Sequence, residues 1–189
     1  YFLLNSEIHK KLLQPSSQLL IHDSQGVIDV IAYFDAANQL VDLPQQTSEH
    51  NIIENFNNSS AKIHNSQLLA QYFYTLEYTT QVLQYTATVL NKLTGQQTCA
   101  NTRPIEIDYL ENVLHKFFVV KLQPHLAHLS RLQHELMPIV TQLFNHLSFS
   151  PEYIERYLKL ADGSIYSDFT HANIMHQQAW QKLLSSCDK

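Results

Sequence analysis

The chain has 189 residues, 44% of them hydrophobic, which suffices for one domain with a real core. Twelve Lys plus Arg against 17 Asp plus Glu give a net charge of -5 without a basic run, so the composition argues against nucleic-acid binding. No window approaches the roughly 20 apolar residues of a membrane span. Only 3 glycines are present, which leaves little of the chemistry of tight turns and favours helices joined by polar loops.

The N-terminal part predicts two helices. Asn5 or Ser6 can cap a short first helix, which Pro15 stops. Apolar residues then recur at helical spacing over 27–41. The β-branched run over 27–31 would also suit a buried strand, but we expect a helix.

The longest predicted helix lies in the middle of the chain. The segment 42–60, rich in Pro, Gln, Asn and Ser, is expected to be a loop carrying one helical turn. The helix then runs from a cap at Asn65 or Ser66 to Leu93, where Gly95 closes it. Its leucines recur every seventh residue and predict a packing seam. The seam leucines are Leu69, Leu76, Leu83 and Leu90.

Prolines indicate where helices begin, end or bend in the second half of the chain. Pro104 suits a first helical position, and Pro124 is expected to interrupt the helix that follows. Leucines over 126–147 continue at helical spacing, with a kink near Pro138. The apolar face before Pro124 is Ile107, Leu110, Leu114 and Phe117.

Two helices complete the prediction. Ser150 and Pro151 start a short helix that Gly163 ends, and Ser167 or Asp168 caps the last one. The sequence therefore predicts an all-α fold, a multi-helix bundle of about six helices with one long central helix, in a single helical domain over 1–189.

Tyrosines crowd the long helix more densely than a packing seam needs. Amphipathic aromatic side chains are favoured at partner interfaces and in ligand pockets, so these residues predict a ligand or partner face. A helix buried among several others would use them too, and that alternative stays open. The tyrosines are Tyr72, Tyr74, Tyr78 and Tyr85.

Eleven histidines are the most unusual chemical feature. His125 and His128 lie on one helical face, and Glu135 follows two turns later on the same side, so a metal ion could be held there. The alternative is a hydrated polar face on which Arg131 pairs with Glu135. Neither H-E-x-x-H nor paired E-x-x-H motifs occur, so no cofactor is predicted, although a metal or a haem held by a histidine stays possible.

Cys99 and Cys187 lack any paired spacing of a zinc site, which leaves a possible disulfide or two free thiols. A disulfide would point to an oxidising compartment. The chain has no G-x-S-x-G elbow, P-loop or dinucleotide fingerprint. We therefore expect a protein that is not an enzyme.

Two stretches carry a family resemblance: PSSQLL from Pro15 to Leu20, and QPHLAHLSR from Gln123 to Arg131, with Cys99 ahead of the second. The chain resembles an uncharacterised family of gammaproteobacterial envelope lipoproteins of the domain of unknown function 3080 type. Members have a signal peptide and a lipid-attached cysteine before the domain. The resemblance implies a periplasmic or envelope location and a missing N-terminal anchor. It transfers no catalytic residues, because none are assigned in the family.

The leading hypothesis is a non-enzymatic helical binding or scaffold domain of the bacterial envelope that binds a protein partner or a small ligand. One alternative is the ligand-sensing domain of a membrane receptor whose spans lie outside this sequence. Another is a histidine-dependent metal or haem protein built on a helical bundle.

Overall fold

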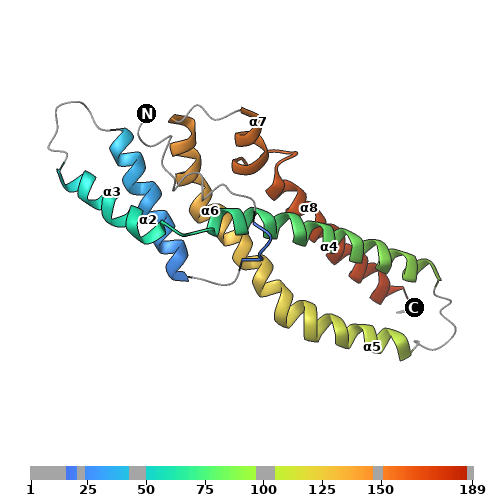
Figure 1. Ribbon diagram of the computed structural model, residues 1–189. Helices are drawn as coiled ribbons and strands as arrows, with labels where there is room; N and C mark the ends of the chain where they lie inside the picture. Colours follow the sequence, from blue (N-terminus) through green and yellow to red (C-terminus); the bar gives the residue numbers. More distant parts are fainter. Residues whose placement is uncertain (1–15, 21–23, 43–49, 97–104, 147–150, 187–189) are drawn as a thin grey trace. The chain divides into compact units, whose positions relative to one another are not determined.

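The computed structural model describes residues 16–20, 24–42, 50–96, 105–146 and 151–186, and within them every regular element is a helix (Figure 1). The predicted all-α fold is confirmed. Two segments, η1 and η2, are π-helical. The elements are α2 (Ser24–Val41), α3 (His50–Ile63), α4 (Leu68–Gln96), α5 (Ile105–Val113), η1 (Leu114–Leu122), α6 (Gln123–His146), α7 (Pro151–Tyr153), η2 (Ile154–Leu158) and α8 (Ile165–Ser185).

The chain divides into two compact units. Unit 1 comprises Tyr1–Leu76 and Leu132–Tyr166, and unit 2 comprises Glu77–Arg131 and Ser167–Lys189. The division falls inside α4, α6 and α8, so it does not coincide with a loop. A single domain over 1–189 stays a prediction. In the described part of the chain, no helix is both long and apolar enough to cross a membrane.

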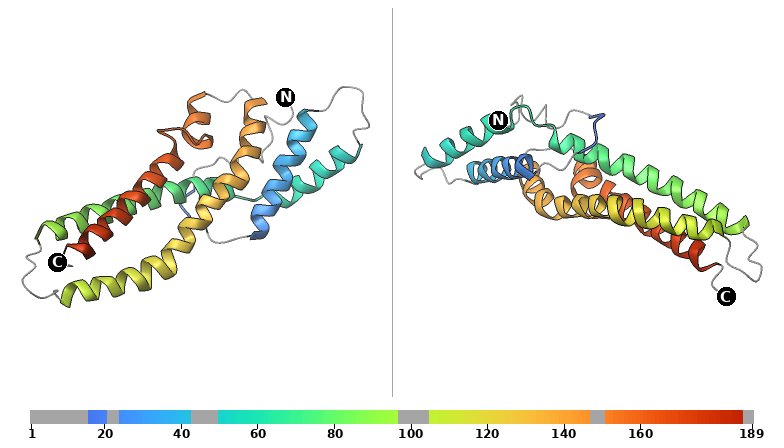
Figure 2. Two further views of the ribbon diagram at one scale, coloured as in Figure 1. Left: turned by 180° about the vertical axis from the view of Figure 1, so that it is seen from behind. Right: turned by 90° about the horizontal axis from the view of Figure 1, so that it is seen from below.

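Unit 1 contains α2 and α3, which pack against each other (Figure 2). The inner face of α2 is set by Val30, Tyr33 and Phe34, all fully buried. The Tyr33 ring lies 5.3 Å from Phe34 and 5.4 Å from Phe56 of α3. Aromatic packing along one face of α2 therefore outweighs the strand preference of its β-branched residues.

The loop predicted over 42–60 is wrong in its second half, because α3 begins at His50. Ile52, Phe56 and Ile63 recur at helical spacing, the first two half-buried and Ile63 buried, and α3 packs against α2. The hydroxyl of Ser59 donates to the backbone carbonyl of Asn55, 2.8 Å away, so this polar residue is accommodated inside the helix. Tertiary burial stabilises a segment whose composition disfavours a helix.

The predicted long helix is α4. The backbone N–H of Leu68 donates to the hydroxyl of Ser66, 3.3 Å away, as expected for the cap. All four seam leucines are buried, Leu69 and Leu76 in unit 1 and Leu83 and Leu90 in unit 2. Gly95 does not close the helix, which continues to Gln96.

The interruption predicted at Pro124 is also wrong, because α5, η1 and α6 form one continuous helical run from Ile105 to His146. The N–H of Gln123 still donates five residues back, to the carbonyl of Phe118, at the end of η1. Pro124 follows where the bonding pattern returns to α, and its missing N–H removes one hydrogen bond from the ladder without ending the run. Phe117, expected on the apolar face, is exposed, and Phe118 is half-buried instead.

The C-terminal helices follow the expected order. Pro151 opens α7, and Gly163 separates η2 from α8 with a φ of +82°, which a glycine adopts without strain. α8 begins at Ile165, so the predicted caps Ser167 and Asp168 lie inside its first turn.

Unit 2 has its own core, made by three helical segments. α4 and α8 supply most of the core residues, and α5 contributes the fully buried Ile107. Three partly buried leucines pack on the cluster: Leu110, Leu114 and Leu184. The core residues are Ala87, Leu90, Ile107, Ala179, Trp180 and Leu183.

Candidate functional site

The four predicted tyrosines of α4 do not share one face. Tyr72 is fully buried in unit 1 and Tyr74 is half-buried. In unit 2, Tyr78 is 46% exposed and Tyr85 is 73% exposed. Tyr72 is thus a core residue, and Tyr78 and Tyr85 are the tyrosines a partner could reach.

Tyr78 and Tyr85 belong to a second apolar stripe on α4, which we call the outer stripe. Its five residues follow one another at spacings of four and three. Four are exposed and Val89 is half-buried, whereas Leu83, Ala87 and Leu90 of the same helix are buried. The outer stripe is Tyr78, Val82, Tyr85, Val89 and Leu93.

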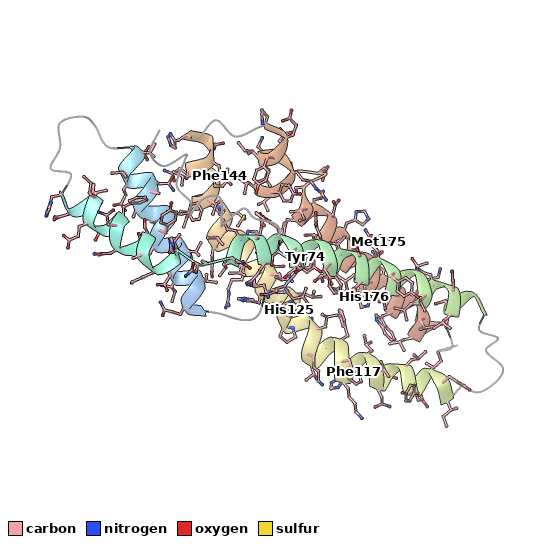
Figure 3. The ribbon with its side chains drawn as sticks, viewed as in Figure 1. Tyr74, Phe117, His125, Phe144, Met175 and His176 are labelled. Atoms are coloured by element: carbon pink, nitrogen blue, oxygen red, sulfur yellow. The ribbon has the colours of Figure 1, made fainter. Side chains whose placement is uncertain are left out.

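Unit 2 exposes more large hydrophobic side chains than unit 1, and the outer stripe is part of this difference. Eleven of the fifteen exposed large hydrophobic residues of the described chain lie in unit 2. They occur on α4, on the run from α5 to η1, and on α8, where Met175 is labelled in Figure 3. Contiguous patches of exposed apolar side chains mark interaction surfaces, whereas single scattered ones are ordinary.

A buried histidine lies at the core of unit 2. The indole N–H of Trp180 donates to Nε2 of His176, 3.2 Å away, so the ring proton must be on Nδ1. The ring of Phe118 packs 4.7 Å from the His176 ring, which is labelled in Figure 3. Burial lowers the pKa of His176, and its residue is only 3% exposed. The group is a neutral core histidine that solvent does not reach.

The residues predicted to hold a metal, His125, His128 and Glu135, all lie on α6. Arg131 Nη2 lies 3.0 Å from Nδ1 of His128, which places a cationic group on one of the nitrogens a metal would use. Burial lowers the pKa of His125, labelled in Figure 3. Within the described ranges no group of three or more His, Cys, Asp or Glu side chains could hold a metal ion. The metal site and the haem alternative stay predictions.

Cys99 and Cys187 lie outside the described residues, so the possible disulfide also stays a prediction.

A pocket of about 460 Å³ opens in unit 1, between α6 and the end of η2. Met137, Pro138 and Leu158 contribute apolar wall, and Gln133 and Lys159 contribute polar groups. No pattern in the sequence predicts this pocket.

Gln133 is the buried polar residue of that pocket. The hydroxyl of Tyr72 donates to Gln133 Oε1 over 2.7 Å, while Gln133 Nε2 has no hydrogen-bond partner among the described residues. Burial raises the pKa of Tyr72, with a further contribution from Tyr166, so the hydroxyl keeps its proton at neutral pH. Gln133 is 1% exposed, so its N–H donors are shielded from bulk water. A buried amide donor without a partner costs free energy.

Comparison with protein families matches residues 1–189, the full chain, to the family described as "Protein of unknown function (DUF3080)". Neither the search of curated proteins nor the search of solved structures found a match.

Proposed function

The chain belongs to the DUF3080 family of proteins of unknown function, and we propose that it is a non-enzymatic binding module that docks a protein partner on the outer stripe of α4. One observation carries the proposal. In unit 2, α4 buries Leu83, Ala87 and Leu90, and the outer stripe adds a second apolar face on which four of five side chains are exposed. A second stripe of this kind is typical of a helix with an external partner.

The spacing of the outer stripe favours a helical partner. Residues spaced three or four apart form a narrow seam along a helix, and such seams receive the side chains of one facing helix. Tyr78 and Tyr85 add large contact areas with few rotatable bonds, so they lose little conformational entropy on binding.

Charge favours a protein over a lipid surface as the partner. From Tyr78 to Leu93 the sequence contains one charged residue, Lys92, and the rest of the rim is Gln, Thr and Asn. Helices that lie on membranes pair their apolar face with several Lys and Arg residues that attract anionic lipids. An uncharged polar rim suits the edge of a protein interface.

Site-specific photo-crosslinking in cells tests this proposal. A photoreactive phenylalanine analogue is placed at Tyr78 or Tyr85, and as matched controls at Gln84 or Asn91, exposed positions on another side of α4. We expect adducts with one distinct polypeptide from the first pair only, identified by mass spectrometry. Adducts that form equally from all four positions, or that contain lipid or a second copy of this chain, would contradict the proposal.

We also propose that the protein works in the bacterial envelope. The resemblance to envelope lipoproteins supports this location. Fractionation of native cells tests it: we expect the protein in the membrane and periplasmic fractions. Recovery in the cytosol alone would exclude the envelope location.

A further inference from the structure

The outward face of η1 is a candidate interaction surface of unit 2 that is separate from the outer stripe of α4. Two half-buried residues, four apart, fix the inner face of η1: Leu114 packs on the core of unit 2, and the ring of Phe118 lies against a histidine of α8. Phe117, labelled in Figure 3, and Val120 are each 57% exposed. η1 therefore presents large apolar side chains outward while its inner face holds it to unit 2.

Basic residues accompany these apolar side chains. Lys116 and Lys121 are both exposed, and no carboxylate of the described residues pairs with either. The ammonium group of Lys121 lies 5.2 Å from the centre of the Phe117 ring, so a cation and an apolar ring meet at one place. Between Glu111 and Glu135 the sequence has three Lys plus Arg and no Asp or Glu, although the whole chain has a net charge of -5. η1 is thus a cationic and apolar surface on an acidic protein.

This combination of charge and apolar area indicates which partner fits η1. Apolar side chains flanked by lysines are typical of helices that lie in the interface between membrane and water. The stem of a lysine lies along apolar surface while its ammonium group reaches the lipid phosphates. A layer of anionic phospholipid offers hydrocarbon to the apolar side chains and negative charge to the lysines. The outer stripe, whose rim is uncharged apart from Lys92, lacks this complementarity.

We propose that η1 docks unit 2 on a membrane surface that carries anionic phospholipid. The side chains of Phe117 and Val120 enter the boundary between head groups and acyl chains, and Lys116 and Lys121 contact phosphates. Binding strength grows with buried apolar area and with the number of basic residues, so this small surface gives a weak, reversible contact. The proposal does not depend on the outer stripe having a protein partner.

Co-sedimentation of the full 189-residue chain with lipid vesicles tests the proposal. Vesicles of phosphatidylcholine alone are compared with vesicles that also contain phosphatidylglycerol, the anionic lipid. We expect the chain to sediment with the anionic vesicles, to be released as the sodium chloride concentration rises, and to stay in solution with the neutral ones. An absence of binding to the anionic vesicles, or equal binding to both kinds, would overturn the proposal.

Two variants of η1 and two controls locate the contact. Lys116→Gln combined with Lys121→Gln is expected to weaken vesicle binding about 25-fold, from about fivefold for each lysine near anionic lipid. Phe117→Ser is expected to weaken it about tenfold. Lys92→Gln on α4 and Lys182→Gln on α8 remove exposed cations elsewhere in unit 2 and should leave binding unchanged. Unchanged binding in both η1 variants, or equal losses in the controls, would refute the assignment to η1.

A photoreactive phenylalanine analogue at Val120 distinguishes a lipid from a protein occupant in cells. We expect adducts with lipid. An adduct with one distinct polypeptide would mean that η1 belongs to a protein interface, and it would overturn the proposal. Tyr85→Ser alters only the outer stripe and should leave vesicle binding unchanged, so η1 and the partner surface of α4 succeed or fail separately.

Discussion

Replacing Leu83 with alanine tests the packing of α4. Leu83 is 1% exposed and lies on the buried seam in unit 2. The substitution removes apolar contacts and leaves a cavity that a helical backbone cannot close, so the expected loss is about 2 to 5 kcal/mol of unfolding free energy. In a chain of this length, each kcal/mol lowers the melting temperature by roughly 2 to 4 °C.

Urea unfolding followed by fluorescence measures this loss. Trp180 is the single tryptophan and lies in the core of the same unit, so its emission reports the region that Leu83 stabilises. The matched control is Val82→Ala. Val82 is the residue before Leu83, lies on the outer stripe and is 41% exposed. We expect it to cost less than about 1 kcal/mol. A midpoint unchanged by Leu83→Ala, or an equal loss in Val82→Ala, would show that the other side of α4 faces the core.

Three further substitutions test individual interactions. Burial lowers the pKa of His176 below its ordinary value of about 6.5, so as the pH falls the unfolded state binds the proton first. The free energy of unfolding should therefore be highest above that pH and fall as the pH drops below it. Urea midpoints at a series of pH values check this, and His176→Gln, which keeps an acceptor for Trp180, should flatten the dependence. Tyr72→Phe removes the bond to Gln133 and should cost about 1 to 3 kcal/mol in thermal unfolding, whereas an unchanged melting temperature would mean that the bond contributes nothing. Gly163→Ala should cost about 1 to 2 kcal/mol through its positive φ alone, since no atom of the described residues beyond its chain neighbours lies within 4 Å of the added methyl; a much larger loss in the same assay would reveal a steric clash.

The regular seams could be predicted from sequence because they repeat. The leucines of α4 recur at a fixed interval, and their burial matches the prediction. α3 was missed because its Asn and Ser residues have low helix propensity, and what stabilises it is the contact of Phe56 with Tyr33 of α2, a tertiary interaction that local pattern does not contain.

Phe117 was assigned to the apolar face in place of its neighbour Phe118, which follows Leu114 by four residues. A ladder from i to i+5 places more residues in each turn than an α-helix, so the apolar face moves along the sequence inside η1. At about 100° per residue, Phe118 lies about 20° and Phe117 about 80° from the direction of Ile107, so a turn count favours Phe118, the ring that packs on His176. The local composition does not indicate that the backbone hydrogen bonds change from the α to the π pattern at η1.

The candidate sites were predictable to different degrees. The outer stripe was signalled by the excess of tyrosines on α4, and counting turns would have placed Tyr72 with the seam, between Leu69 and Leu76. The pocket could not be foreseen, because it forms where the end of η2 meets α6. Its one local signal is Gln133, a polar residue next to Leu132 on an otherwise apolar face.

The composition of the outer stripe has a consequence for isolating any complex built on it. Apolar contacts of this kind are driven by entropy near room temperature and weaken on cooling, so work in the cold room would promote dissociation. Because Lys92 is the one charged residue from Tyr78 to Leu93, raising the sodium chloride concentration would weaken such a complex little. Sulfate salts, which strengthen apolar burial, would help to retain the partner through purification.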